Sequence, residues 1–218
     1  MTLHPLIAIA AALLAAAPAT AQAQAEAPPS PVVAAELPQV TLDTELGPVV
    51  VELDTVHAPV TAGNFLRYVK EKRFDGMSFY RAVNVADGYG LVQGGTQGDP
   101  NKTLPPIAHE PTTQTGLTHT DGTLSMARAA PGSATGDFFI IVGDLTSLDA
   151  GPTDTAGTGD TLGFAAFGHV VAGMDVVHRI LVAPTSPTAG EGAMIGQMLA
   201  PRITIRTARV TPAVEVAE

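Results

Sequence analysis

Hydrophobic and polar residues begin to alternate at Gln39, and this pattern predicts a β-hairpin at the start of the folded part. Residues 40–44 alternate, and residues 49–53 form a second short run that is rich in valine. Between them, residues 45–48 contain a glycine followed by a proline, which is typical of a tight turn. We therefore expect two antiparallel strands joined by this turn.

Two segments of the chain show helical periodicity. In residues 58–70, the apolar residues Phe65, Leu66 and Val69 fall on one face, and charged residues occupy the other. Residues 173–181 form a second short helical segment, with a glycine at its start in the position of an N-cap. We expect the first of these helices to cover one end of a β structure.

Further short apolar runs with β character follow along the chain. They lie at residues 79–81, 91–93, 122–128, 138–142, 164–171 and 201–210. A polar loop at 96–106 and a loop rich in glycine, threonine and aspartate at 150–163 separate some of them. Short strands with two helices indicate an all-β fold, a closed antiparallel barrel, because closure leaves no strand edge exposed. Residues 185–200 show only a polar turn followed by an apolar loop.

The first 23 residues have the pattern of a secretory signal peptide. Residues 3–17 form an apolar run that is too short to span a membrane, and Ala19 and Ala21 fit the small-residue rule for cleavage. A buried core helix is the alternative, but this run has no polar face and a low-complexity stretch follows it. The first residues contain no lysine or arginine, which departs from the usual pattern. We expect cleavage to release the mature protein into the periplasm.

The rest of the chain divides into three parts by composition. Residues 24–38 are rich in proline and alanine and resemble a flexible linker. Residues 39–212 carry the strand and helix patterns and are expected to form one domain. Residues 213–218 are expected to be a disordered tail.

Composition and charge exclude several classes of function. Of the 218 residues, 45% are hydrophobic, and 21 acidic residues outnumber 11 basic ones, giving a net charge of −10. Such a surface repels phosphate backbones, so we expect no nucleic-acid partner. The absence of cysteine excludes thiol catalysis, disulfides, Cys-ligated zinc and a lipid anchor. No two of the six histidines have the i, i+4 spacing of a helical metal site, and we expect neither a metal nor a cofactor.

The stretch that best suggests chemistry is residues 79–95, FYRAVNVADGYGLVQGG. It places Arg81 directly after an aromatic pair in a predicted strand, and it ends in Gln93 and two glycines. An arginine in an apolar β segment is unusual, because its charge is costly to desolvate without a partner. A strand arginine that reaches solvent or a carboxylate is the simplest alternative.

The wider series of motifs resembles the cyclophilin family of peptidyl-prolyl cis-trans isomerases, over about residues 40–210. The motifs that carry the resemblance, in order, are Phe79-Tyr80-Arg81, Gln93-Gly94-Gly95, residues 122–127 (GTLSMA), Phe138-Phe139-Ile140, Leu148-Asp149 and residues 167–171 (FGHVV). The signal peptide and short loops make the chain most similar to the bacterial secreted branch. The resemblance implies an eight-stranded barrel capped by two helices, with the active groove on its outer face.

The chemistry of that family suits these residues. Rotation about an X–Pro bond crosses a barrier of roughly 18–20 kcal/mol that arises from amide resonance. The reaction makes and breaks no covalent bond, so it needs no nucleophile, metal or cofactor. It needs a hydrogen-bond donor aimed at the prolyl nitrogen, an apolar seat for the ring, and donors that hold the flanking carbonyl group. We expect Arg81 to be the donor, because a guanidinium stays charged at any working pH.

The resemblance also implies roles for the other groove residues. Gln93 would position Arg81 and the substrate, and Ala127, Arg128 and Ala129 would present backbone groups to an extended peptide. The apolar seat and groove would be formed by Leu91, Met126, Asp137, Phe139, Leu148 and Phe164. Some of these residues have a purely structural alternative: Met126 and Phe139 as core, Gln93 as a turn residue.

The sequence departs from the family pattern at several positions of the expected groove. Asp137 stands where a glutamine is usual, Ser147 where an aromatic is usual, and Phe164 where histidine or tyrosine is common. Gly90 falls where a pocket phenylalanine is expected, and Tyr89 would substitute for it if the loop shifts. We expect the carboxylate of Asp137 to pair with Arg81.

Three functions compete at this point. The first is a secreted isomerase, expected to be a monomer, that acts on proline-containing unfolded or extended polypeptides. The second is a catalytically weak barrel that binds proline segments as a chaperone, which Asp137, Ser147 and Gly90 favour. The third, a carrier with a small apolar ligand inside the barrel, is disfavoured because large residues such as Phe65 and Phe138 should fill the interior.

Overall fold

The computed structural model describes residues 36–211 of the chain. The predicted signal peptide at 1–23, most of the linker at 24–38 and the tail at 213–218 lie outside the described residues. Within 36–211, no helix is long and apolar enough to cross a membrane.

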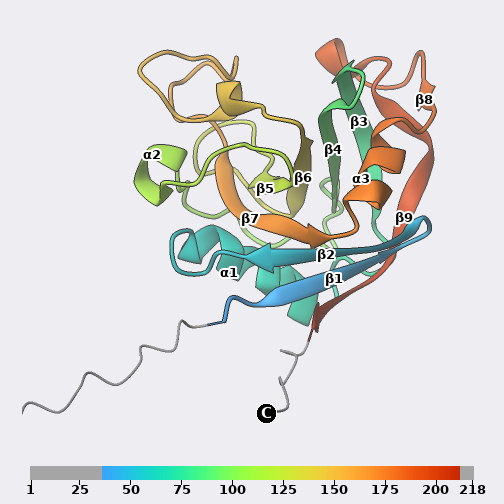
Figure 1. Cartoon of the computed structure of the whole chain (residues 1–218), viewed down its shortest axis with the longest axis horizontal. Helices are drawn as coiled ribbons and strands as arrows, with labels where there is room; N and C mark the ends of the chain where they lie inside the picture. The colour runs from blue at the N-terminus through green and yellow to red at the C-terminus, as the bar shows by residue number, and fades with distance from the viewer. Residues whose placement is uncertain (1–35, 212–218) are drawn as a thin grey trace, which may run out of the picture. The chain divides into compact units, whose positions relative to one another are not determined.

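Eight antiparallel strands close into a barrel, as the sequence predicted (Figure 1). Around the barrel the order is β1, β2, β7, β5, β6, β4, β3 and β9, and β9 pairs with β1 to complete the circle. Their bounds are β1 Gln39–Thr44, β2 Gly47–Leu53, β3 Ser78–Ala86, β4 Tyr89–Gly95, β5 Thr123–Met126, β6 Asp137–Val142, β7 Ala165–Ala172 and β9 Met198–Thr211. The two-residue strand β8, Thr185–Ser186, pairs with the start of β9.

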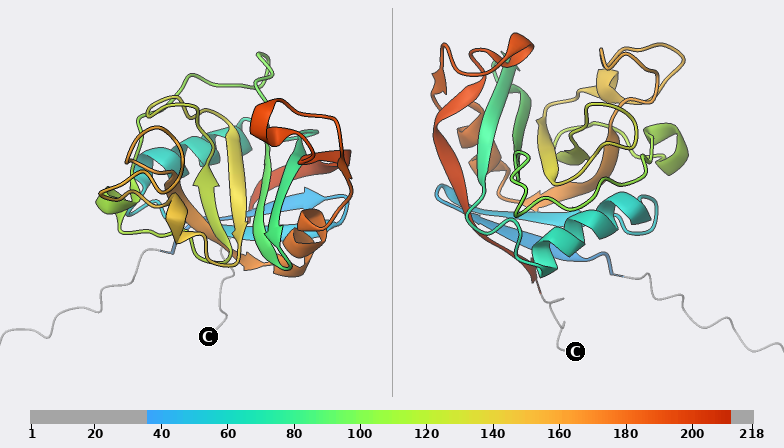
Figure 2. Two further views of the ribbon diagram at one scale, coloured as in Figure 1. Left: turned by 90° about the horizontal axis from the view of Figure 1, so that it is seen from above. Right: turned by 180° about the vertical axis from the view of Figure 1, so that it is seen from behind.

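Both predicted helices are present at their predicted positions. Helix α1, Pro59–Lys70, begins with a proline, which needs no N–H in the first turn. Helix α3, Met174–Leu181, begins after Gly173, which adopts a left-handed conformation with φ of +91°. The two helices lie on opposite sides of the barrel (Figure 2).

Three single-turn helices lie in the loops between the strands. They are the α-helical turn α2, Thr112–Thr115, and the 3₁₀ turns η1, Thr146–Leu148, and η2, Gly192–Met194. The sequence predicted none of these three turns, nor β8, which lies with η2 in the segment 185–200. The last strand also begins earlier than predicted, at Met198 rather than at residue 201.

Aromatic rings fill the barrel interior. Phe65 projects from α1 and lies 5.2 Å from Phe138 and 5.3 Å from Phe167 between ring centroids. Phe79 packs edge-on against Phe138 at 5.8 Å. All four side chains are buried, and rings of this size leave no lumen for a ligand. The prediction that large residues occupy the interior is confirmed.

Candidate active site

Strand pairing brings Arg81 and Gln93 together on the outer wall of the barrel. The two residues are register partners across β3 and β4. Nη1 of Arg81 donates a hydrogen bond of 2.9 Å to Oε1 of Gln93. Cross-strand partners lie close enough for such contacts, so this pair follows directly from the hairpin register.

A second glutamine, Gln197, also holds the guanidinium. Nε and Nη2 of Arg81 donate to its Oε1 over 2.9 and 2.7 Å. The backbone of Gln197 is anchored as well, because its carbonyl oxygen accepts a 2.9 Å bond from the N–H of Ala82. Nothing in the sequence around residue 197 signalled this role, since the contact depends on how segment 185–200 returns to β3.

The contacts of Arg81 leave part of the guanidinium available. A guanidinium carries five N–H groups, and three of them are used by Gln93 and Gln197. Within residues 36–211, one N–H on each terminal nitrogen has no partner. Partial burial lowers the pKa of Arg81, while the neighbouring phenol of Tyr80 raises it. The group remains a cation at neutral pH.

Tyr80 and Asp137 extend this network on one side. Nε2 of Gln93 donates a 2.7 Å hydrogen bond to the Tyr80 hydroxyl. Burial raises the pKa of Tyr80, and the nearby negative charge of Asp137 raises it further, so the phenol stays protonated. The network therefore fixes the rotamer of Gln93 and, through it, the position of Arg81.

The predicted pairing of Asp137 with Arg81 is wrong. Among residues 36–211, no ion pair joins them; instead Oδ1 of Asp137 accepts a 2.7 Å bond from the backbone N–H of Gln97. Burial raises the pKa of Asp137, and the bond from Gln97 opposes that shift. The physical reason is strand register: Asp137 pairs with Gly95, whereas Arg81 pairs with Gln93, so the carboxylate lies beside the backbone of residues 95–97.

An apolar cluster separate from the barrel core lies on the same wall. Phe139, Ile141 and Leu145 are buried in it, and half-buried side chains surround them. Those surrounding residues are Tyr89, Leu91, Ala127, Leu148 and Phe164. Phe139 and Phe164 meet edge to face with centroids 5.3 Å apart. Because Phe139 is the register partner of Gln93, the cluster lies beside the Arg81 network.

The prediction that Met126 belongs to the apolar seat is wrong. Its side chain is buried in the main core with Phe138 rather than in the outer cluster. Side chains alternate between the two faces of a strand, and Ser125, not Met126, is the β5 residue that pairs with Phe139. The structural alternative for Met126 is therefore the correct one.

Tyr89 provides the aromatic wall that Gly90 lacks. The tyrosine packs against the outer cluster, and its hydroxyl donates a 2.5 Å bond to the carbonyl oxygen of Asp144. A side chain at position 90 is excluded, because a Cβ atom there would collide with the carbonyl oxygen of Val83. The register of the β3–β4 hairpin is irregular near its tip, and the aromatic ring is therefore supplied by residue 89 instead of the expected residue 90.

A buried series of hydrogen-bonded side chains lies beneath this cluster. His119 is fully buried; Nδ1 lies 2.6 Å from Oδ1 of Asp149, and Nε2 lies 2.8 Å from the Ser125 hydroxyl. Its ring stacks on Phe139 with centroids 6.1 Å apart. Burial lowers the pKa of His119, although Asp149 raises it. The ring therefore supports Phe139 as a neutral group. No pattern in the sequence indicated this support.

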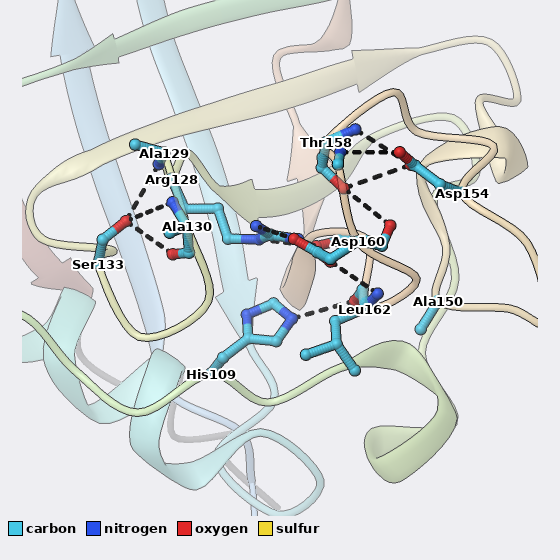
Figure 3. Close-up of polar contacts among 12 residues, drawn as sticks. His109, Arg128, Ala129, Ala130, Ser133, Ala150, Asp154, Thr158, Asp160 and Leu162 are labelled. Carbon is cyan, nitrogen blue, oxygen red and sulfur yellow. Dashed lines mark hydrogen bonds and ion pairs between the residues drawn. The ribbon is translucent and has the colours of Figure 1, made fainter.

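Arg128 fastens the 150–163 loop to the edge of the cluster (Figure 3). Its Nη1 and Nη2 form two bonds of 2.9 and 2.8 Å with the Asp160 carboxylate, and Nε donates to the Gly163 carbonyl oxygen over 2.8 Å. The guanidinium also lies 5.4 Å from the centre of the Phe164 ring. The resemblance implied that Arg128 presents backbone groups to the peptide, and its side chain has this additional structural role.

The loop itself is held by side-chain to backbone contacts. The carboxylate of Asp154 accepts bonds from the backbone N–H groups of Thr158 and Gly159, at 3.0 and 2.8 Å. Nε2 of His109 lies 3.0 Å from the carbonyl oxygen of Leu162 (Figure 3). The segment therefore forms a defined wall beside Phe164.

This geometry agrees with the comparisons to known proteins. The family model for cyclophilin type peptidyl-prolyl cis-trans isomerases matches residues 39–210. The chain belongs to this family. It is therefore a peptidyl-prolyl cis-trans isomerase, as the motif series indicated.

Curated relatives of this cyclophilin are bacterial and eukaryotic isomerases. A peptidyl-prolyl cis-trans isomerase of Acinetobacter baylyi is 40% identical over 151 residues, which cover 67% of this chain and 73% of the relative. Peptidyl-prolyl cis-trans isomerase B of Escherichia coli is 39% identical over 144 residues, covering 65% and 82%. A solved cyclophilin-type isomerase of Cryptosporidium parvum, determined in the presence of the dipeptide Ala-Pro, has a TM-score of 0.63 at 19% identity and covers 80% of this chain and 99% of that one. The last similarity supports the fold.

In this cyclophilin the predicted site residues fall into two adjacent groups. Arg81 and Gln93 form the polar group, with Asp137 beside them. Leu91, Ala127, Phe139, Leu148 and Phe164 form the apolar group. Arg128 and Ala129 follow Ala127 at the edge of the second group, and the Ala129 backbone N–H donates to the Ser133 hydroxyl over 3.1 Å (Figure 3). Only Met126 lies elsewhere.

Proposed function

We propose that this cyclophilin rotates X–Pro bonds by donating a hydrogen bond from Arg81 to the prolyl nitrogen. One observation carries the proposal. In the part of the chain that the structure describes, Arg81 keeps an unused N–H on each terminal nitrogen, on the same barrel wall as the apolar cluster. The cluster would hold the proline ring, and the guanidinium would meet the nitrogen of the same residue.

The physical basis is differential binding of the transition state. In the planar amide, resonance delocalises the nitrogen lone pair and makes it a poor acceptor. As the bond twists, the lone pair localises and the hydrogen bond from Arg81 strengthens. An interaction that is stronger in the transition state than in the ground state accelerates the reaction. Gln93 and Gln197 would keep the donor in place, so no reorganisation is needed as the bond turns.

The test replaces the proposed donor. Arg81→Ala should reduce kcat/KM on an Ala-Pro peptide by roughly tenfold to a hundredfold or more, because hydrogen bonds to charged groups contribute about 1.5–3 kcal/mol. Exchange of cis and trans signals measured by NMR gives the rate without a coupled protease. Arg67→Ala, on the exposed face of α1, is the matched control. Wild-type turnover by Arg81→Ala would exclude the mechanism.

A catalytically weak proline-binding chaperone is the second candidate. It is favoured by Ser147, which is exposed on η1 next to Leu148 and provides no aromatic wall there. This candidate predicts that the wild type and the Arg81→Ala variant suppress aggregation of an unfolded, proline-containing protein equally well. If slow refolding phases are accelerated only when Arg81 is present, the isomerase proposal is supported instead.

We propose that its substrates are exported, proline-containing polypeptides that are still unfolded or extended. The apolar N-terminal run with small residues before the cleavage site supports a periplasmic location and a place in the bacterial secreted branch. Proline isomerisation otherwise takes about 10–100 s, which is slow relative to most folding steps. Fractionation of cells that express the full chain tests the location, and full-length protein in the cytoplasm would contradict it. Gel filtration tests the expected monomeric state.

A further inference from the structure

A large cavity lies next to the Arg81 network, apart from the apolar cluster. It has a volume of about 730 Å³. Tyr80, Gln93 and Asp137 of the Arg81 network line it on one side, and Met194, Met198 and Glu191 are among its other lining residues. None of Leu91, Phe139, Leu148 or Phe164 lines it. Gln93 therefore borders this cavity and also pairs in register with Phe139 of the apolar cluster.

Strand register relates this cavity to the seat expected for proline. On β6, Asp137 and Phe139 alternate with Phe138, so both point to the outer face, and they pair with Gly95 and Gln93 on β4. Two residues of a strand rise by about 7 Å. A bound peptide in extended conformation advances at the same rate. A side chain two residues away from the proline can thus enter the cavity while the ring occupies the seat beside Phe139.

The lining determines which side chain fits. The sulfur-containing chains of Met194 and Met198 are flexible and suit a long aliphatic stem. Carboxylates are present at two places, Asp137 beside the Arg81 network and Glu191 on the exposed segment before η2. Within residues 36–211, Oδ1 of Asp137 accepts a 2.7 Å bond from the Gln97 N–H; burial raises the pKa of this carboxyl group, and the Tyr80 hydroxyl also lowers it. A carboxylate has about four acceptor positions, so it can accept a further donor. Arg202, exposed at the rim, is the one opposing charge among the described residues that line the cavity.

We propose that this cavity is a second substrate subsite that takes a lysine or arginine side chain two residues from the proline. The stem would lie along the two methionines and the cationic head would reach Asp137 and Glu191. The proposal rests on the isomerase function proposed above. It adds a substrate class to that function: extended, basic segments around proline.

The test compares peptides that differ only in charge. Lys-Ala-Pro-Phe, Ala-Ala-Pro-Phe and Glu-Ala-Pro-Phe, and the reversed set Phe-Pro-Ala-Lys, Phe-Pro-Ala-Ala and Phe-Pro-Ala-Glu, are followed by NMR exchange with the full mature protein. We expect kcat/KM to be about threefold to tenfold higher for lysine than for glutamate on one side of the proline, the range of a partly exposed ion pair. Equal rates for lysine and glutamate in both sets would overturn the subsite. Failure to turn over even the alanine peptides would overturn the isomerase proposal itself.

Charge variants locate the effect in the cavity. Asp137→Asn and Glu191→Gln should each reduce the lysine-to-glutamate ratio, and the double variant should bring it close to one. Asp175→Asn, which removes the same charge from the exposed face of α3, is the matched control and should leave the ratio unchanged. Because the readout is a ratio, a general loss of folding or turnover does not mimic it. A ratio that survives in the double variant, or that falls equally in Asp175→Asn, would contradict the assignment.

Discussion

Arg81 and Gln197 are 116 residues apart in the chain, and two donors of one are bound to a single oxygen of the other. This contact uses the side of the guanidinium that carries Nε, and Gln93 uses one N–H of Nη1. The two glutamines together restrict the group to one orientation. A donor held this way loses little conformational entropy when the substrate binds.

Replacing Gln197 should therefore lower kcat more than it weakens substrate binding. We expect Gln197→Ala to reduce kcat by about tenfold, in proportion to a lost hydrogen bond to a charged group, with KM nearly unchanged. Gln114→Ala, on the exposed face of α2, is the control for a glutamine of no expected catalytic role. A Gln197→Ala variant with wild-type kcat would show that Gln93 alone positions the guanidinium.

Tyr89 should contribute to binding of the proline ring. Removing its ring with Tyr89→Ala opens one wall of the outer cluster, so KM should rise by about fivefold to thirtyfold, or ~1–2 kcal/mol of lost apolar contact. Tyr89→Phe keeps the wall and removes only the bond to the Asp144 carbonyl oxygen. Its KM should stay close to that of the wild type. An equal loss in both variants would indicate that the hydroxyl, rather than the ring, matters.

The Arg128–Asp160 pair should behave non-additively. The Arg128 side chain is only 1% exposed, so Asp160→Ala leaves a buried charge without its partner and should lower Tm. Arg128→Met combined with Asp160→Ala removes that charge as well, and it should melt at or above the temperature of the single Asp160→Ala variant. Calorimetry on the wild type, both single variants and the double variant decides the matter. If the double variant shows the sum of both losses, the charge is not the origin of the effect.

His119 should make the protein less stable in mild acid. Its folded pKa is lowered by burial, so below about pH 6.5, the usual histidine value, the unfolded chain binds the proton first. The free energy of unfolding then falls as the pH drops from about 6.5 through the folded pKa, and above 6.5 the effect is absent. The His119→Gln variant has no titratable group at this position. Urea unfolding at several pH values gives the difference in the free energy of unfolding between the wild type and His119→Gln. This difference should shrink as the pH falls towards 5, and a difference that does not change with pH would contradict the prediction.

Local patterns in the sequence were sufficient to predict the architecture. Period-two alternation at Gln39–Thr44 and helical periodicity at Pro59–Lys70 depend only on neighbouring residues, and both elements formed as predicted. The placement of Gln93 beside Arg81 was implied by the family resemblance, and the β3–β4 hairpin brings the two residues together as register partners. The order of the motifs along the chain indicated the family, which no single motif would have identified.

The remaining features of the site were decided by tertiary structure. Asp137 bonds to the Gln97 backbone rather than to Arg81 because strand register places it opposite Gly95. Gln197 reaches Arg81 from a segment with no readable pattern. Tertiary structure also decided on which face of β5 the Met126 side chain lies, because that face is set by the register with β6. Local sequence specifies which elements form, whereas hydrogen-bond partners are chosen by competition among groups that only the closed barrel brings together.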